Sequence, residues 1–310
     1  MLNKKQNLML AVCAGVTLSS VAFAQGYPPQ PPPAYPQQAP PAYPPQQPPQ
    51  GYPQQAPPGY PQQAPPPQYT PQDLDNLVAR VALYPDPLLS QVLAAATYSN
   101  EIPEAAAWAN QHAYLHGDAL AAAIQQDQLP WDPSVQSLLP FPQILNMMAS
   151  DMNWTSAIGN AFLADSPGVM NAVQDRRQLA MQYGYLRSNG QVAVANSGGY
   201  ITLMPVNPAF IPVPVYNPGV VFLAPRPGFF VGGAITFGGV SIGAAFAPWG
   251  WGHNYFDWGA HRVIINNHPW ARTWVNRGAY VHPYEHVQRY APGRPRVERH
   301  DPHERHDHER

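Results

Sequence analysis

Residues 74–98 read LDNLVARVALYPDPLLSQVLAAATY, and this stretch sets the fold class of the chain. Apolar residues recur at intervals of three and four in two blocks, residues 74–82 and 88–96, which is the spacing of one helix face. Asp86 precedes Pro87 between the blocks, and a capping side chain before proline is a common helix start. The stretch therefore predicts two amphipathic helices.

The helical pattern continues through residues 73–187. Asp132-Pro133 and Ser166-Pro167 repeat the arrangement of a capping side chain before a proline, and Glu101 and Glu104 lie in the opening turn of a helix that runs through Trp108. Further helices are predicted over residues 118–125, 141–150, 155–163 and 167–186. A region of 115 residues is large enough to bury a core of its own.

After Arg187 the pattern favours extended chain, with a turn signal at residues 196–199. Pro212 and Pro214 would both remove a donor from the same side of a strand, which is tolerated at an edge that faces solvent. We expect a small, irregular β element that packs against the helical domain.

Residues 227–256 contain no Asp, Glu, Lys or Arg and admit two interpretations. In the first, residues 229–247 form a membrane-spanning helix, with Gly239 and Gly243 at a helix contact and Trp249 and Trp251 at the interface. In the second, residues 234–237 and 240–243 form a β-hairpin around Gly238-Gly239. Five glycines within residues 229–247 weaken a helix and favour the hairpin.

The N-terminal 24 residues are typical of a secretory signal peptide. Lys4 and Lys5 precede an apolar stretch at residues 8–21, and Ala22-Phe23-Ala24 supplies the small residues of a cleavage site. The alternative is a lipoprotein acylated at Cys13, but the bulky Val12 disfavours it. Cleavage after Ala24 removes the one cysteine, and with it disulfides and thiolate chemistry.

Residues 25–72 form a degenerate Pro/Gln/Tyr repeat that holds 20 of the 41 prolines. Proline fixes φ and removes donors, and the repeat has no aliphatic side chains to bury, so we expect a disordered tether with much polyproline II. One interpretation is a solvated spacer. The other is a ligand for an aromatic-lined groove or a contact with cell-wall polymer through the tyrosines.

Aromatic residues from Trp249 to Trp274 are interleaved with Arg262, Arg272 and Arg277. The interpretations are a cover for a poorly packed extension, stacking on sugar rings, or a position at a lipid interface. An exported protein rarely meets nucleic acid and no recognition fold is visible, so we expect no nucleic-acid partner.

The C-terminal segment, residues 282–310, carries six of the eleven histidines. His300, His303, His306 and His308 are candidate metal ligands, because neutral imidazole binds Zn²⁺, Ni²⁺ or Cu²⁺. Nothing apolar here could organise a second shell of ligand-orienting groups. The alternatives are a disordered, solvated tail and a protonation-sensitive contact.

Catalytic signals are missing from the sequence. The aspartates of the helical region sit where helix caps or turns explain them, and neither His112 nor His116 has a serine motif or paired carboxylate at a telling distance. We therefore expect no enzyme activity and no cofactor. The helical region holds 11 acidic and 4 basic residues, which disfavours its binding to anionic lipid.

Three ordered motifs resemble a known family. The run at residues 74–98, the blocks WDPSV at 131–135 and FPQIL at 141–145, and PVPVYNP at 212–218 are similar to the DUF3300 proteins, a bacterial family of unknown function. The resemblance implies a membrane or envelope protein and brings no catalytic residues with it.

The sequence thus predicts a mainly α protein, in which a compact helical domain is followed by a small irregular β extension, with disordered Pro-rich N-terminal and His-rich C-terminal segments. We expect export to the periplasm or cell envelope of a Gram-negative bacterium. The expected role is structural or interactive, with an envelope protein or cell-wall polymer as partner; the alternatives are an integral membrane protein and a periplasmic metal binder. The predicted segments are a signal peptide (1–24), the tether (25–72), a helical domain (73–187), a β-rich segment (188–226), a Gly/Trp-rich hairpin or membrane-associating segment (227–281) and the tail (282–310).

Overall fold

The computed structural model describes residues 64–225, 232–280 and 284, which belong to one compact unit. The signal peptide, most of the tether and, apart from Tyr284, the tail with its four candidate histidines lie outside the described residues. In chain order the elements are α1 (Pro71–Val78), α2 (Asp86–Ala96), the 3-10 helix η1 (Ser99–Glu101), α3 (Ile102–Gln111), α4 (Gly117–Gln126), α5 (Pro133–Gln136), α6 (Pro142–Ser150), α7 (Met152–Ala164), α8 (Ser166–Gln182), β1 (Val192–Ser197), β2 (Tyr200–Pro205), β3 (Phe210–Tyr216), α9 (Pro218–Val221), β4 (Ile235–Ser241), the 3-10 helix η2 (Ala244–Trp249), β5 (Tyr255–Asp257), β6 (Arg262–Ile265) and β7 (His268–Pro269).

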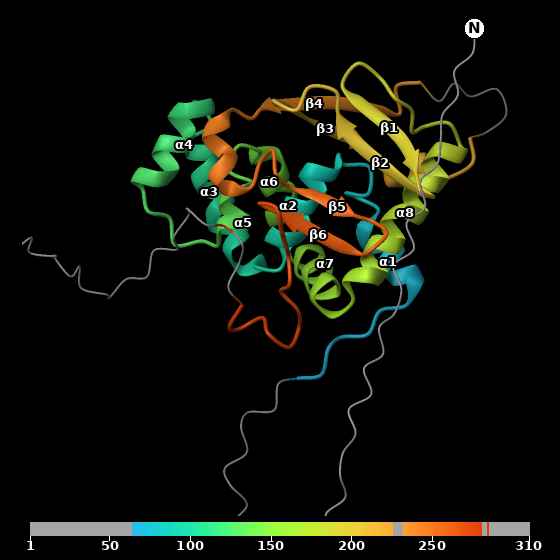
Figure 1. Ribbon diagram of the computed structural model, residues 1–310, viewed down its shortest axis with the longest axis horizontal. Coiled ribbons are helices and arrows are strands. Elements are labelled where there is room, and N and C mark those ends of the chain that lie inside the picture. Colours follow the sequence, from blue (N-terminus) through green and yellow to red (C-terminus); the bar gives the residue numbers. More distant parts are fainter. Residues whose placement is uncertain (1–63, 226–231, 281–283, 285–310) are drawn as a thin grey trace, which may run out of the picture. The chain divides into compact units, whose positions relative to one another are not determined.

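The prediction of helices within residues 73–187 is confirmed, but α2 is buried on every side and is therefore not the amphipathic helix that was expected (Figure 1). Helix α2 is buried along its whole length and lies at the centre, with α7, α5 and the strands β5 and β6 packed against it. Gly159 of α7 allows the closest approach, because a Cβ built there would lie 2.0 Å from the Ala96 carbonyl oxygen of α2. The two helices therefore meet backbone to backbone.

Two of the three predicted capping side chains are wrong. Asp132 caps α5 by accepting a hydrogen bond from the Ser134 amide, as predicted. Asp86, however, is the first residue of α2 and its carboxylate is used elsewhere, while the cap of α8 is Asp165 rather than Ser166. Asp165 accepts from the Gly168 amide at 2.9 Å. In both cases the helix begins one residue earlier than predicted, so the proline is its second residue rather than its first.

Strands β1 and β2 form the antiparallel hairpin predicted around residues 196–199. Gly198 and Gly199 make the two-residue turn with φ values of 60° and 88°, which lie in the left-handed region. The hairpin packs through β2 against α2 and α8. This confirms the expectation that the β element packs against the helices.

The predicted hairpin around Gly238-Gly239 is wrong. Residues 235–241 form one continuous strand, β4, which pairs antiparallel with β3, so that Gly238 faces Val213 and Gly239 faces Pro212. Glycine permits a turn but does not require one. Here β3, distant in sequence, supplies a pairing partner along the full length of β4.

The predicted membrane-spanning helix over residues 229–247 is also wrong for its described part, which forms β4 and the start of η2. Along the described ranges, no helix combines the length and the apolar character needed to cross a bilayer.

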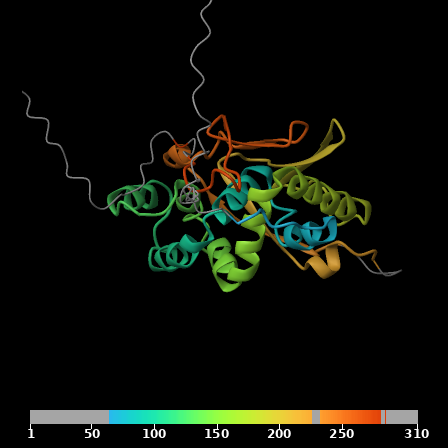
Figure 2. The same ribbon diagram turned by 90° about the horizontal axis from the view of Figure 1, so that it is seen from below.

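Helices and strands share a single hydrophobic core. The hairpin β5–β6 lies across α2, and η2 lies beside α4 (Figures 1 and 2). Trp249, Trp251, Trp258 and Trp270 belong to this core and retain only 1%, 3%, 5% and 9% of their exposure. The aromatic stretch is therefore not a poorly packed cover, and these four rings cannot stack on sugars or rest in lipid.

Candidate functional site

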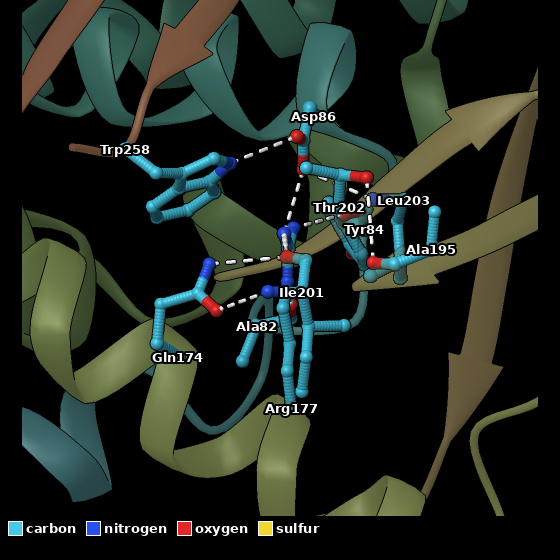
Figure 3. A network of polar contacts seen from close by, with 10 residues as sticks. All are labelled: Ala82, Tyr84, Asp86, Gln174, Arg177, Ala195, Ile201, Thr202, Leu203 and Trp258. Atoms are coloured by element: carbon cyan, nitrogen blue, oxygen red, sulfur yellow. Dashed lines mark hydrogen bonds and ion pairs between the residues drawn. The ribbon is translucent and has the colours of Figure 1, made fainter. Parts of the chain in front are cut away.

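A buried ion pair joins the helices to the strands (Figure 3). Arg177 Nη1 of α8 lies 2.7 Å from Asp86 Oδ1 of α2, and the two side chains are 0% and 3% exposed. The Trp258 indole donates to Asp86 Oδ2 at 3.1 Å, and its ring lies 4.9 Å from the Arg177 guanidinium carbon. Asp86 therefore does not cap α2 as expected. Its carboxylate belongs instead to a network that links α2 to α8 and to Trp258.

Arg177 also donates to three backbone carbonyls. It donates to Ala82 O at 2.9 Å, to Tyr84 O at 3.0 Å and to Ile201 O at 2.8 Å. A buried charge is tolerated when it is paired and its remaining donors are used. The side chains of this network are almost fully buried and its contacts are internal, so it stabilises the fold and presents little surface to a ligand.

A second network holds the tryptophans. Gln91 of α2 donates to Trp249 O at 2.8 Å and accepts from the Tyr284 hydroxyl at 2.8 Å. The Trp249 indole donates to Gln136 Oε1 at 3.0 Å, and the Trp251 indole donates to Ser137 O at 3.0 Å. The indole N–H groups of Trp249 and Trp251 thus both have a partner, which fixes this part of the aromatic segment to α2 and to the α5 region.

The best candidate site is a polar cavity of about 320 Å³. It is built where the end of η1, the start of α5 and the chain after β7 meet. We call it the polar pocket and define it by its lining residues, which are Tyr98, Asn100, Glu101, Asp132, Arg272, Arg277, Gly278 and Tyr280. A concave site with convergent polar groups is the usual form of a binding site.

The floor of the polar pocket is preorganised. Glu101 accepts a hydrogen bond from the Asp132 amide at 2.5 Å, and Asp132 accepts from the Ser134 hydroxyl at 2.6 Å. The Arg272 guanidinium carbon lies 3.7 Å from the centroid of the Tyr98 ring, and Arg272 also donates to Arg277 O at 3.0 Å. Both carboxylates and Arg272 are therefore held in place before any ligand arrives.

The phenols of the polar pocket are neutral at physiological pH. Burial raises the pKa of Tyr98 far above its ordinary value, and the charge of Asp132, which is hydrogen-bonded to Tyr98, adds to the rise. Burial also raises the pKa of Tyr280, whose hydroxyl accepts from the Ala271 amide at 3.0 Å. Tyr98 and Tyr280 can thus act as hydrogen-bonding groups but not as phenolate bases.

At the rim, Asn100 is exposed. Arg277 is half-buried, with its guanidinium carbon 3.8 Å from the centroid of the Trp274 ring.

The candidate metal ligands stay a prediction, because His300, His303, His306 and His308 lie outside the described residues. Within the described ranges, no three His, Cys, Asp or Glu side chains are grouped as a metal site requires. None of the pocket residues was nominated from the sequence as a site. Asp132 in the block WDPSV and the arginines among the tryptophans were visible signals, but nothing in the sequence showed that they meet.

The architecture defines a class of protein in which a helical domain is completed by short strands and a tryptophan-rich segment. A family model described as "Protein of unknown function (DUF3300)" matches residues 70–288, and the chain belongs to this family. The chain is similar to the uncharacterized protein YacH of Escherichia coli (strain K12), with 37% identity over 186 residues. That match covers 50% of this chain and 30% of YacH, so the chain spans less than two thirds of its relative. No solved structure matches the chain.

Proposed function

We propose that the protein is a non-enzymatic, exported envelope protein that binds a partner through the polar pocket. The observation that carries the proposal is the pocket itself, in which two arginines and two neutral tyrosines converge on prealigned carboxylates. Such a set suits hydroxyl and amide groups, which both donate and accept. A cell-wall polymer and the backbone of an envelope protein present those groups.

Export and the tether complete the proposal. The leader at residues 1–24 supports delivery across the inner membrane. The end of the repeat belongs to the folded unit, because Trp274 donates to Ala64 O, Tyr69 donates to Ala157 O and α1 begins at Pro71. The remaining 39 residues, 25–63, would span up to about 120 Å at the polyproline rise, which would let the folded domain search a wide volume for its partner.

The test places a photo-crosslinking amino acid at Asn100, on the exposed rim of the pocket, in intact cells. The matched control carries the same group at Gln125, which is exposed on α4 and outside the pocket. We expect a discrete crosslinked product from position 100 that is missing from position 125. Equal labelling at both positions would remove the pocket from the proposal, and retention of the chain in the cytoplasmic fraction would remove export.

A further inference from the structure

The strands β1 to β4 form two separate two-stranded sheets, and their outer edges are treated differently. The outer edge of β1 is satisfied by the segment that precedes it. Asn189 Oδ1 accepts from the Val192 amide at 2.9 Å, and Ser188 Oγ accepts from the Val194 amide at 2.9 Å. The amides of Val192 and Val194 are therefore not available to pair with another strand.

The outer edge of β2 is satisfied from α8 and α2. The Gln174 side chain accepts from the Ile201 amide at 2.7 Å and donates to its carbonyl at 3.1 Å. Arg177 donates to the same carbonyl, and Asp86 accepts from the Leu203 amide at 3.5 Å. Side chains therefore occupy this edge as a further strand would.

The outer edge of β3 is closed by proline. The Ile242 amide donates to Ala209 O at 2.8 Å, so the alternation of an antiparallel ladder directs residues 211, 213 and 215 toward β4. Pro212 and Pro214 then point outward, where their missing donors interrupt no bond to β4. Both prolines are buried, which corrects the expectation of a solvent-facing edge. A donor-free edge can be buried without leaving N–H groups unsatisfied.

The outer edge of β4 has none of these protections. The same alternation directs the backbone of Ile235, Phe237, Gly239 and Ser241 outward, and no residue in the described ranges hydrogen bonds to these groups. The strand has no charge and no proline, and its register with β3 is unbroken. Such an edge is a template for another strand.

We propose that the outer edge of β4 pairs with β4 of a second copy of the chain, antiparallel about a two-fold axis at Gly238. In this register Phe237 lies opposite Gly239 of the second copy and Ile235 lies opposite its Ser241. All four are outward-directed residues, so each exchanges both backbone hydrogen bonds with its opposite. Gly238 of one copy lies opposite Gly238 of the other at the axis, where no side chain obstructs the approach of the two strands.

The lack of charge along β4 favours a second copy of the chain as the partner of this edge. Residues 227–256 carry no charged side chain, so two copies of β4 meet without like-charge repulsion. The acidic helical region, with 11 acids and 4 basic residues, disfavours self-association through its own surface. A charged peptide would gain no ion pair along β4. The proposal goes beyond the envelope role and does not depend on the polar pocket.

The experiment uses the chain expressed with its own leader, purified, and studied by sedimentation velocity from about 1 to about 100 μM. We expect a monomer–dimer equilibrium. Gly238→Lys places two ammonium groups at the axis and raises the dissociation constant by about tenfold or more. A Cβ at Gly238 meets nothing closer than Val213 O at 3.9 Å, so the fold tolerates the change. Gly190→Lys, at an exposed glycine with nothing within 4 Å, adds the same charge elsewhere and leaves the dimer intact.

A charge swap tests both the occupant and the register. Gly238→Glu is expected to be monomeric alone, and mixing it with Gly238→Lys restores a dimer, because residue 238 of each copy faces residue 238 of the other. Circular dichroism serves as the control that both variants are folded. A monomeric wild type at every concentration, a Gly238→Lys variant that still dimerises, or a mixture that stays monomeric would each overturn the proposal.

Discussion

Replacement of Arg177 by Met should destabilise the fold far more than the loss of an exposed charge. The change removes the ion-pair partner of Asp86, which is 2% exposed, and leaves its buried negative charge without a positive group to balance it. It also deprives the carbonyls of Ala82, Tyr84 and Ile201 of a donor. Breaking a buried pair by removing one partner costs about 3 to 5 kcal/mol. We expect a loss of that size from the free energy of unfolding.

The assay is urea denaturation followed by tryptophan fluorescence, with Arg80→Met as the matched control. Arg80 pairs with Asp151 at 2.8 Å, but the two side chains are 44% and 35% exposed, so this loss should cost no more than about 1 kcal/mol. Combining Arg177→Met with Asp86→Asn removes the uncompensated charge and should cost less than the two single changes added together. Equal losses for Arg177→Met and Arg80→Met would refute the reasoning.

Three further changes probe other parts of the structure. Gly159→Ala drives a Cβ into the Ala96 carbonyl and should cost about 1 to 3 kcal/mol in urea denaturation; an unchanged midpoint would contradict the close approach of α7 to α2. Asp165→Ala should cost about 1 kcal/mol and Ser166→Ala much less, and the reverse order would restore Ser166 as the cap. Burial raises the pKa of Tyr84 to about 12, so its contribution is complete below pH 10 and is lost as the pH rises through 12. Wild type should therefore lose about 2 to 3 kcal/mol more than Tyr84→Phe between pH 9 and 12, and parallel pH profiles would count against this burial.

Local patterns predicted the helices well. Spacing of apolar residues and the positions of proline placed α2, α4, α6, α7 and α8 within a few residues of their observed bounds. The β1–β2 turn was also predicted, because Gly198 and Gly199 are local signals for positive φ. These features depend on neighbours in the sequence, which the pattern contains.

Features that depend on distant residues were missed. Asp86 was predicted to cap a helix because Pro87 follows it. In the structure its carboxylate pairs with Arg177, which lies 91 positions away in the sequence. Gly238 and Gly239 looked like a turn, yet β3 pairs across them. The polar pocket likewise combines residues near 100, 132 and 275, and no spacing rule relates these positions.

The burial of the tryptophans could not be predicted from the sequence either. Trp249 lies in a Gly-rich, uncharged stretch, and Trp258 lies just after it, in a pattern that is typical of an interface or a loose extension. Their burial follows from Gln136 and Asp86, which accept their indole N–H groups from helices far upstream. The composition of a segment does not show which polar acceptors on a distant, buried helix will bind its side chains.

The central claim is that the aromatic segment after η2 and the helices form one core. Urea unfolding followed in parallel by far-ultraviolet circular dichroism, which reports the helices, and by tryptophan fluorescence tests it most directly. A shared core predicts a single transition with the same midpoint for both probes. Two separated midpoints, with fluorescence lost before helicity, would show that the aromatic segment is a separate extension and would contradict the account.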